Sequence, residues 1–454
     1  MTVRWLGHVF FPRQIPAIIA SIVFLSLCWT SATYAIPSFA QQTGQPCSAC
    51  HVGAFGPQLK PYGRDFKLFG YQSSDDMSHV PPIAAMLQTS VTHTQVNQNP
   101  PPAADFGQNN NFAVDQVSLF YGGKAPLGLG VFAQVTYSGV SHGFNLDNFD
   151  IRKAKEFDPP GHNIVAGIDF NNNPTVQDVW NSTPAWGFPY NSSSLAPGAQ
   201  ASALIDGALA GQVVSGGGYA LFDNTLYLEG AAYLPLERQF AGRLGEGEDG
   251  RSDRFVGAMP YGRIALLHDF GPAPAATVEV GAYGLQARRY PGGDVSRGTD
   301  TITDWAIDGV YQFIGDGRHV VSAHATYIHE DQDLGASSAL AGTRRKNQIG
   351  EVRADISYSF ADTLTPSVQL FSLTGTYDPA LYASGLRTSG YVLELAWSPF
   401  GKPNSPVWWA NARLAVQYVG YTEFNGAQRA ASDNNTLFLN LWVALAPFGS
   451  MVRR

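Results

Sequence analysis

Hydrophobic and polar residues alternate with a period of two along most of this chain, from about Ile83 to its end. Successive side chains of a β-strand point to opposite faces, so each alternating stretch predicts a strand with one apolar and one polar face. The stretch 351–360 shows the pattern clearly, with apolar residues at Val352, Ala354, Ile356, Tyr358 and Phe360. Strands of about nine to eleven residues with two such faces are typical of a membrane β-barrel that has a wet lumen.

The alternation predicts sixteen strands, whose connections differ regularly in length. The strands cover residues 83–97, 111–121, 129–138, 148–156, 163–170, 210–221, 226–234, 261–269, 276–286, 303–313, 319–329, 350–360, 366–375, 389–398, 408–420 and 435–446. The connections at 171–209, 235–259, 287–302 and 330–349 are long, and those around 222–225, 270–275, 314–318 and 361–365 are brief. Bacterial outer-membrane barrels have an even strand number, short periplasmic turns and long outer loops. We therefore expect a mainly β fold, a transmembrane antiparallel β-barrel of about 16 strands.

Aromatic residues indicate which end of the predicted barrel faces the periplasm. A phenylalanine stands at or beside the brief connections, at Phe157, Phe222, Phe270, Phe313, Phe360 and Phe400. Aromatic rings gather where a membrane meets water, so these residues predict an interfacial girdle on the periplasmic side. Both ends of the barrel sequence then lie on that side. A water-soluble β-sandwich is the alternative fold, and it would usually carry more outward charge and shorter loops at both ends.

The first residues have the composition of a secretory signal peptide. Arg4 and Arg13 accompany an apolar run, Ile15 to Cys28, that is too short to span a bilayer as a helix. Small residues follow, and we expect cleavage after Ala35. The chain thus divides into a signal peptide at 1–35, an N-terminal segment at 36–82 and an outer-membrane barrel at 83–454.

Charge and cysteine content narrow the range of partners. Removal of the signal peptide takes two of the 28 basic residues and none of the 36 acidic ones, which leaves a net charge of about −10. This balance speaks against nucleic acid or an anionic membrane surface as a partner and allows cations such as metal ions. Once Cys28 is removed, only Cys47 and Cys50 remain, so no disulfide framework supports the exported chain.

The sequence Cys47-Ser48-Ala49-Cys50-His51 has the Cys-x-x-Cys-His spacing of c-type haem attachment. Two thiols on one helical turn can reach the two vinyl groups of a porphyrin, and the adjacent imidazole is directed toward the iron as the proximal ligand. A redox dithiol and half of a zinc site are the alternatives. A redox dithiol would require a βαβ pattern around the motif, which is missing. A zinc site would require a second cysteine pair, which is also missing. We therefore predict one covalent haem c, bound by Cys47 and Cys50, with His51 as an iron ligand.

A short helix is predicted downstream of this motif. Leu59, Tyr62, Phe66 and Phe69 recur at the spacing of one helix face, and Gly70 ends the helix. We expect this face either to cover the porphyrin or to pack on the barrel mouth. The basic residues of the same stretch are Lys60, Arg64 and Lys67, which we expect on a solvated face, with pairing to the haem propionates as the alternative.

The second axial ligand of the haem iron has few candidates. Met77 and His79 lie in the linker before the barrel. Met86 lies on the first predicted strand, where its alternation partners are polar, so its side chain should face the lumen. A thioether among polar lumen residues is hard to explain by packing, which makes Met86 the preferred ligand over Met77, His79 or an open iron position. A methionine ligand would raise the reduction potential.

The N-terminal segment also resembles the N-terminal part of a known protein family. The matching residues are Ala35–Ala40, Thr43-Gly44, Cys47–His51, Pro57–Leu59, Tyr62-Gly63, Phe66-Lys67 and Gly70-Tyr71. They are closely similar to the head of the fused monohaem cytochrome–porins, outer-membrane proteins associated with the oxidation of extracellular ferrous iron. The resemblance implies that Cys47 and Cys50 attach the haem, that His51 is the proximal ligand and that a barrel follows.

Three further stretches are candidate sites. The long connection that begins at Asn171-Asn172-Asn173-Pro174 either folds into the lumen as a constriction or lies on the surface. The acidic clusters Glu246–Asp249 and His329–Asp333 could bind a hard cation, although solvated outer-loop charge is the preferred interpretation. No nucleophile elbow, phosphate-binding loop or His-Glu-x-x-His helix is found, and nothing suggests hydrolysis.

These features predict an electron conduit. A donor outside the cell, with ferrous iron as a candidate, would give an electron to the haem, which would pass it to a periplasmic electron-transfer protein. Electrons must cross a hydrocarbon layer about 25 Å thick through a single haem, so the haem should lie within the lumen. The segment that carries it should enter from the periplasm. A diffusion porin with a haem-bearing plug or docking module is one alternative. A haem enzyme with an open iron position is the other.

Overall fold

The computed structural model describes residues 38–72, 82–245, 254–271, 275–382, 385–403, 405, 407 and 410–445. Several predicted features lie outside these residues, namely the signal peptide, the alternative ligands Met77 and His79, and the acidic cluster at 246–249. Within the described residues, no helix has both the length and the apolar character needed to cross a membrane.

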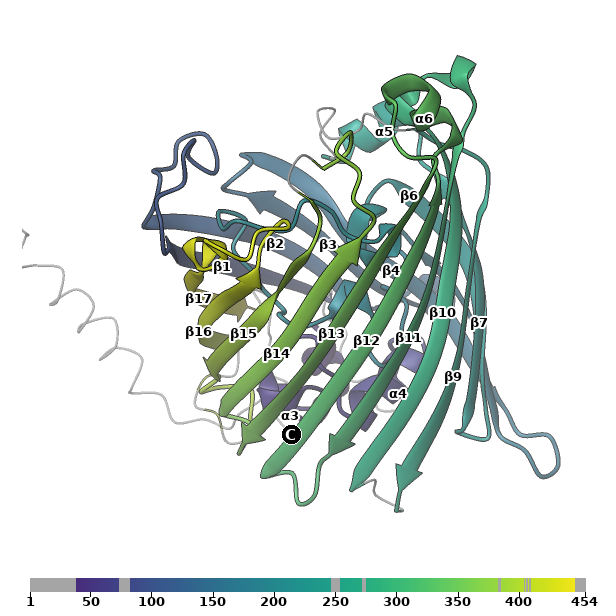
Figure 1. Ribbon diagram of the computed structural model, residues 1–454. Coiled ribbons are helices and arrows are strands. Elements are labelled where there is room, and N and C mark those ends of the chain that lie inside the picture. The colour runs from purple at the N-terminus through teal and green to yellow at the C-terminus, as the bar shows by residue number, and fades with distance from the viewer. Residues whose placement is uncertain are drawn as a thin grey trace, which may run out of the picture.

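The strands form one antiparallel sheet that closes on itself as a barrel (Figure 1). The strands are β1 Ile83–Thr94, β2 Asn111–Ala125, β3 Leu129–Ser138, β4 Gly143–Phe157, β5 Ile164–Asn171, β6 Val213–Phe222, β7 Leu226–Pro235, β8 Arg254–Phe255, β9 Met259–Phe270, β10 Ala276–Tyr290, β11 Asp300–Phe313, β12 His319–Asp333, β13 Lys346–Phe360, β14 Leu364–Gly375, β15 Thr388–Trp397, β16 Ala410–Glu423 and β17 Thr436–Leu445. β8 is a two-residue piece beside the end of β10, so the described wall has sixteen long strands. Pairing of β1 with β17 closes the barrel, and the predicted fold class is confirmed.

All sixteen predicted segments coincide with long strands, but β10 to β13 extend further than expected toward the end with long connections. The connections predicted at 287–302 and 330–349 are correspondingly shorter. The interpretation of His329–Asp333 as outer-loop charge is therefore wrong, because these residues form the last part of β12. Glu330 is buried in the lumen, since alternate residues of the strand point inward. A run of consecutive polar residues hides the alternation that would have revealed this strand.

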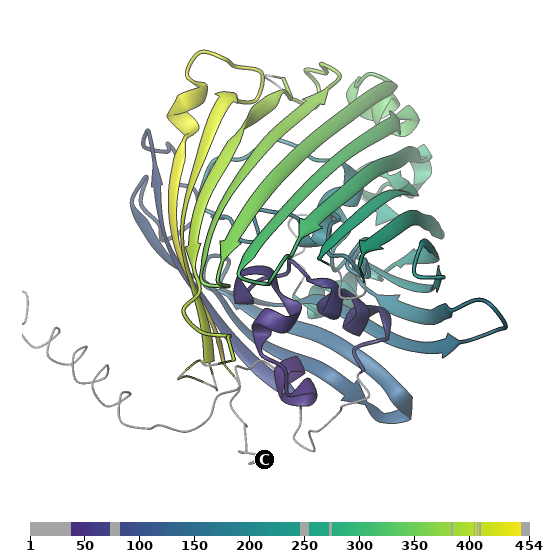
Figure 2. The ribbon, with the colours of Figure 1, turned by 90° about the horizontal axis from the view of Figure 1, so that it is seen from below.

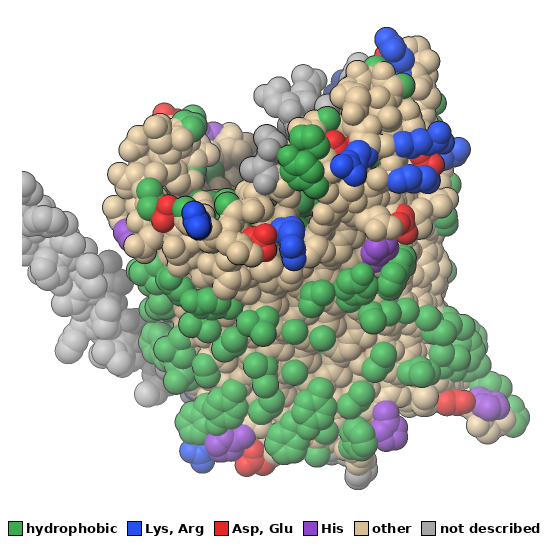
Figure 3. Space-filling model, in the orientation of Figure 1, with side chains coloured by type: hydrophobic (Ala, Val, Ile, Leu, Met, Phe, Trp, Pro, Cys, Tyr) green, Lys and Arg blue, Asp and Glu red, His purple; other side chains and the backbone are tan. Residues whose placement is uncertain are grey.

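The side-chain pattern of the wall is the reverse of that in a soluble protein. Along β13, Val352 and Ile356 are about half exposed on the outside, whereas Glu351 and Ser359 are buried inside. Figure 3 shows the outer face as a broad band of hydrophobic side chains, with charged side chains gathered above and below it. An apolar belt around a polar interior is the arrangement that a bilayer-spanning barrel requires. At the short-turn ends the outward phenylalanines Phe157, Phe270, Phe313 and Phe360 are each more than a third exposed, as the predicted girdle requires.

Two brief turns have a conformation that fits the twist of their hairpins. Both turns contain two residues with φ in the left-handed region. The φ values are 50° for Asp223 and 48° for Asn224 in one turn, and 52° for Ala361 and 50° for Asp362 in the other. Turns with two such residues match the right-handed twist of the flanking strands, and Asp and Asn tolerate this conformation well. Asp362 is thereby fixed at the short-turn end of the barrel, where it faces the N-terminal segment.

The described part of the N-terminal segment, residues 38–72, lies inside the short-turn mouth of the barrel. Its helices are α2 Ser38–Thr43, α3 Cys47–Cys50 and α4 Pro61–Leu68. Figure 2 shows them within the ring of strands when the barrel is seen from below. The remaining helices, α5 Arg238–Arg243 and α6 Gly335–Ala341, lie in long connections at the opposite end (Figure 1).

The connection between β5 and β6, residues 172–212, folds into the lumen, and we call it the inward loop. Its residues contact strands on several sides of the wall. Ser182 donates to Asp308 of β11 at 2.9 Å, and Gln417 of β16 donates to the backbone oxygen of Asn191 at 3.1 Å. At its far end, the backbone nitrogen of Leu204 donates to Glu330 at 2.5 Å. Of the two conformations left open by the sequence, the inward one is present.

Placing a charge on the outer belt should destabilise the barrel. Leu370, near the middle of β14, is 62% exposed and points away from the lumen. We expect Leu370→Arg to lower the free energy of unfolding by about 2–4 kcal/mol, because an arginine would be buried in hydrocarbon. The measurement is urea unfolding of protein refolded into lipid vesicles. Val295→Arg is the control, since Val295 is 55% exposed but lies in the connection between β10 and β11. An equal loss in both variants would argue against a bilayer around β14.

Candidate functional site

The Cys-x-x-Cys-His motif forms one short helical turn followed by extended backbone. The backbone nitrogen of His51 donates to the oxygen of Cys47 at 2.9 Å, which closes the turn and places both cysteines beside each other. His51 then leaves the helix with φ −115° and ψ 139° and pairs with Leu59 in an antiparallel bridge. The imidazole is thus held next to the two thiols by backbone hydrogen bonds, as the motif predicts.

Helix α4 packs unusually close to this turn because residue 63 is glycine. A Cβ atom on Gly63 would lie 2.6 Å from the backbone oxygen of Cys50. The backbone nitrogen of Lys60 donates to that same oxygen at 2.7 Å. The glycine therefore allows α4 to lie directly against the motif.

A cavity of about 560 Å³ opens beside the motif and extends between the N-terminal segment, the inward loop and the barrel wall. Cys47, Cys50, His51 and Met86 all line it. This brings together four residues that the sequence singled out, with Met86 contributed by β1 and the other three by the N-terminal segment. Cavities of about 300–1,000 Å³ are the usual size of cofactor sites.

The walls of this cavity suit a large apolar group. The aromatic and aliphatic lining residues include Phe39, Phe55, Leu59, Phe66, Phe120, Phe132, Trp186 and Trp442. Polar residues also line the cavity, among them Gln88, Gln116, Gln134, Asn145, Asp147, Asn148 and Asn173. An apolar body with a polar end is the character of a haem, whose propionates are charged. The lining therefore fits the cofactor that the motif predicts.

The imidazole of His51 lines the cavity and has one ring nitrogen without a partner among the described residues. Its Nδ1 atom is buried and has no hydrogen-bond partner among the described residues, which is uncommon for a polar atom. Burial lowers the pKa of His51 to about 4, with the nearby Lys60 charge as a further cause. The ring is therefore neutral, which is the form that coordinates iron.

The two thiols are not those of a typical redox dithiol. Burial raises the pKa of Cys47 to about 11 and that of Cys50 to about 12, because a thiolate loses its hydration there. Redox-active cysteines have lowered pKa values at partly exposed, electropositive positions. The surroundings of Cys47 and Cys50 thus disfavour the thiolate form that thiol exchange requires.

Met86 lines this cavity together with other side chains that carry potential ligand atoms. Its side chain is 5% exposed, as expected for a residue that faces the lumen from β1. Two other lining residues with donor atoms already have partners, since Lys67 donates to Asn181 at 2.7 Å and Tyr71 donates to Asp150 at 2.6 Å. The hydroxyl of Tyr190 has no hydrogen-bond partner among the described residues and is the remaining competitor.

The basic residues Lys60, Arg64 and Lys67 do not lie on a solvated face, and this expectation is wrong. Lys60 forms an ion pair with Asp362 at 2.9 Å, and Arg64 binds both oxygens of Asp269 at 3.1 and 2.9 Å. Lys67 is 3% exposed and donates to the backbone of the inward loop. Lys60 and Arg64 thus tie the N-terminal segment to the wall, and Lys67 ties it to the loop.

The predicted helix face is only partly correct. Leu59 and Phe66 line the cavity as expected, and Phe69 packs against a buried cluster of the barrel wall. Tyr62, by contrast, is 39% exposed and points away from the cavity. The face that covers the cavity is therefore narrower than the sequence suggests and includes Gly63 and Lys67.

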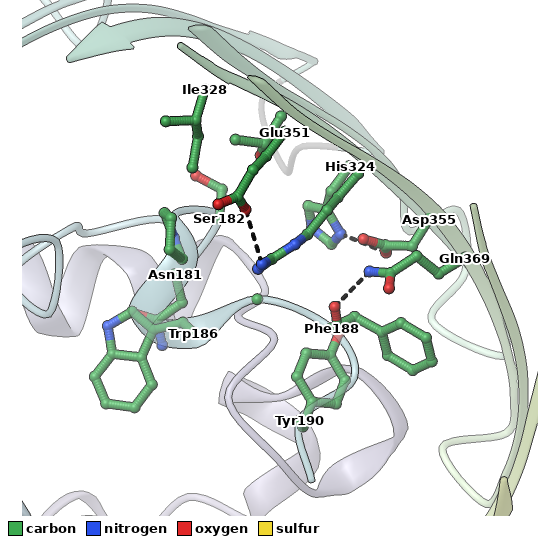
Figure 4. A pocket seen from close by; sticks show the side chains of 14 residues that line it. Asn181, Ser182, Trp186, Phe188, Tyr190, His324, Ile328, Glu351, Asp355 and Gln369 are labelled. Carbon is green, nitrogen blue, oxygen red and sulfur yellow. Dashed lines mark hydrogen bonds and ion pairs between the residues drawn. The ribbon is translucent and has the colours of Figure 1, made fainter. Parts of the chain in front are cut away.

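A second, much smaller pocket of about 30 Å³ lies on the other side of the inward loop. Figure 4 shows it between loop residues and the wall, where His324 Nδ1 lies 3.0 Å from Asp355. Trp186 and Tyr190 line both this pocket and the large cavity, so one layer of loop separates the two. Within the described residues, no group of three or more His, Cys, Asp or Glu residues is arranged to hold a metal ion.

Comparison with known proteins gives matches among solved structures alone. No protein-family model and no curated protein matches this chain. Among solved structures, the chain is similar to OmpT of Vibrio cholerae (10% identity, 81% of this chain and 99% of that one, TM-score 0.38). It is also similar to the outer membrane channel DcaP of Acinetobacter baumannii (10%, 80% and 96%, 0.43) and an anion-selective porin from Comamonas acidovorans (9%, 80% and 98%, 0.44). Similarity at this level adds nothing to what the strand pairing itself shows.

Sequence reasoning missed several residues that complete the site. Asn411 of β16 donates to the backbone oxygen of Ala54 at 2.7 Å and so supports the loop after the motif. Gln88 faces the cavity two residues after Met86, and the alternation of β1 could have identified it. Asn191 could not have been found, because its place depends on how the inward loop crosses the lumen.

Proposed function

We propose that this chain is an outer-membrane electron-transfer protein that carries one covalent haem c in the periplasmic end of its barrel. One observation carries the proposal: Cys47, Cys50, His51 and Met86, from two distant parts of the chain, line a single cavity of cofactor size. The two cysteines would attach the haem, and His51 and Met86 would be its axial ligands. When bound, the haem supplies a one-electron couple.

The chain's own residues define how such a cofactor is held. The turn of α3 fixes the spacing of the two thiols, and the bridge between His51 and Leu59 fixes the imidazole. Apolar rings around the cavity exclude water, and a thioether ligand favours the reduced state relative to a second imidazole. Ion pairs of Lys60 and Arg64 with the wall keep the segment in the mouth.

The position of the cavity suits transfer across the membrane. It reaches from the N-terminal segment at the short-turn end to Asn145 near the opposite end of β4. A small reduced donor from outside, such as ferrous iron, would approach through this polar part of the lumen. On the periplasmic side, the exposed Tyr62 of α4 marks the side where a periplasmic electron carrier would dock.

A diffusion porin with a haem-bearing plug is a second candidate. Barrels of sixteen strands are wide enough for an aqueous channel, and an inward loop often narrows such a channel. Against this candidate, the N-terminal segment and the inward loop both occupy the lumen and bind the wall through buried polar contacts. A haem enzyme is the least favoured function, because Met86 as the second ligand would fill the iron position that an enzyme needs to keep open.

Covalent haem attachment is the first test of the proposal. Protein produced with a c-type maturation system should keep haem through denaturing electrophoresis, because thioether bonds survive unfolding. The double variant Cys47→Ala/Cys50→Ala should lose all haem-dependent peroxidase staining in the gel. Ser48→Ala, a change within the same motif that leaves both thiols, should stain like the natural protein. Absence of stain in the natural protein would refute the proposal.

The axial ligand is tested by absorption spectra and by magnetic circular dichroism of the oxidised protein. Met86→Leu preserves side-chain volume and so should cost less than about 1.5 kcal/mol of stability. It removes the sulfur, however, and we expect the low-spin spectrum to be replaced largely by a high-spin one. Tyr190→Phe removes the competing hydroxyl and should leave the spectrum unchanged. If Met86→Leu leaves the spectrum unchanged and Tyr190→Phe alters it, the ligand is Tyr190.

One preparation can separate the conduit from the porin. For the conduit, oxidised protein in detergent should be reduced rapidly by anaerobic ferrous iron, while single-channel recordings in planar bilayers should show little conductance. A porin should give large, stable conductance steps and no fast reduction. Slow reduction with low conductance would keep the haem site but exclude ferrous iron as the donor.

A further inference from the structure

The side chain of Gln88 contacts Met86, the proposed distal ligand. Its amide nitrogen Nε2 is 3.6 Å from the sulfur atom of Met86, within hydrogen-bonding distance for sulfur. The side chain of Gln88 is 4% exposed, so water does not compete for this contact. Both residues point into the lumen because they are two positions apart on β1.

The orientation of the Gln88 amide is fixed by the inward loop. Its oxygen Oε1 accepts a hydrogen bond from the side-chain nitrogen of Asn191. That interaction directs the oxygen toward the loop and the nitrogen toward Met86, with Gln116 Oε1 as a weaker acceptor at 3.5 Å. Asn191 is held in turn by Gln417 of β16, which donates to its backbone oxygen.

We propose that Gln88 is a positioning residue that holds Met86 as the haem ligand and raises the reduction potential of the iron. This inference rests on the proposed function. A thioether sulfur has two lone pairs, so an N–H group on one of them orients the other. Hydrogen bonds to metal ligands tune both ligand strength and potential.

The direction of the effect follows from electrostatics. The hydrogen atoms of the Gln88 amide carry partial positive charge and face the ligand sulfur. Oxidation adds one positive charge at the iron, and that charge is disfavoured beside an N–H group in a site shielded from water. Gln88 should therefore stabilise the reduced state and make the haem a stronger electron acceptor.

The same contacts connect the outer side of the barrel with the site. Asn191 belongs to the inward loop, which starts and ends at the long-connection end of the barrel. A change in the loop that moves Asn191 would release the Gln88 oxygen and allow its amide to turn away from Met86. The hydrogen-bonded series Gln417, Asn191, Gln88 and Met86 thus couples the loop to the potential of the haem.

The test is the midpoint potential of the haem-loaded full-length protein. We expect Gln88→Leu to shift the equilibrium constant for reduction about tenfold toward the oxidised state, equivalent to about 59 mV for one electron. Gln88→Asn, which is shorter by one methylene and withdraws the donor, should shift it in the same direction. Asn191→Ala should produce a smaller shift of the same sign.

Gln134→Leu is the matched control, because Gln134 lines the same cavity from β3 and its amide donates to Ser118 and Thr136 at 3.3 and 3.1 Å rather than, among the described residues, to Met86 or Gln88. If Gln88→Leu and Gln88→Asn shift the potential no more than this control, the role of Gln88 is overturned while the haem site stands. If Met86→Leu leaves the spectrum unchanged, the distal ligand of the proposed function is wrong, and the role of Gln88 falls with it.

Discussion

The N-terminal segment is too short to form a hydrophobic core by itself, and this constraint explains how it is held inside the barrel. The N-terminal segment contributes two thiols, an imidazole and a few rings, too little surface for a folded domain of its own. The rest of the shelter comes from β1 to β4, from β16 and β17, and from the inward loop. The segment is held in place by charge pairs whose partners lie at the turn end of the wall, such as Asp362 and Asp269.

The polar lumen makes this arrangement possible. Arg263 is fully buried between Glu279 and Asp308, at 2.9 and 2.8 Å, and its guanidinium lies 5.5 Å from the ring centre of Trp180 on the inward loop. Buried charges are stable only when paired and hydrogen-bonded. The wall supplies these pairs along several strands, and so an irregular loop can cross the interior with its backbone groups satisfied.

Much of the fold could be predicted because alternation is a local signal. Every long strand of the described residues coincides with a predicted segment, and Cys47, Cys50, His51 and Met86, which spacing and side-chain direction singled out, line one cavity. The errors concern residues whose partners are distant in sequence. Lys60 and Arg64 resemble solvated charges until the wall brings Asp362 and Asp269 to them. The path of the inward loop depends on Asp308, Glu330 and Gln417, on three different strands, and no local pattern encodes that combination.

The seam of the barrel runs along the cavity. Met86 belongs to the first strand, and Trp442 belongs to the last, where Met86 pairs in register with Ala444. These two strands meet only when the cylinder is complete. The cavity is therefore complete only after the final strand pairing, and a defect in closure at this seam would open it to lipid and water.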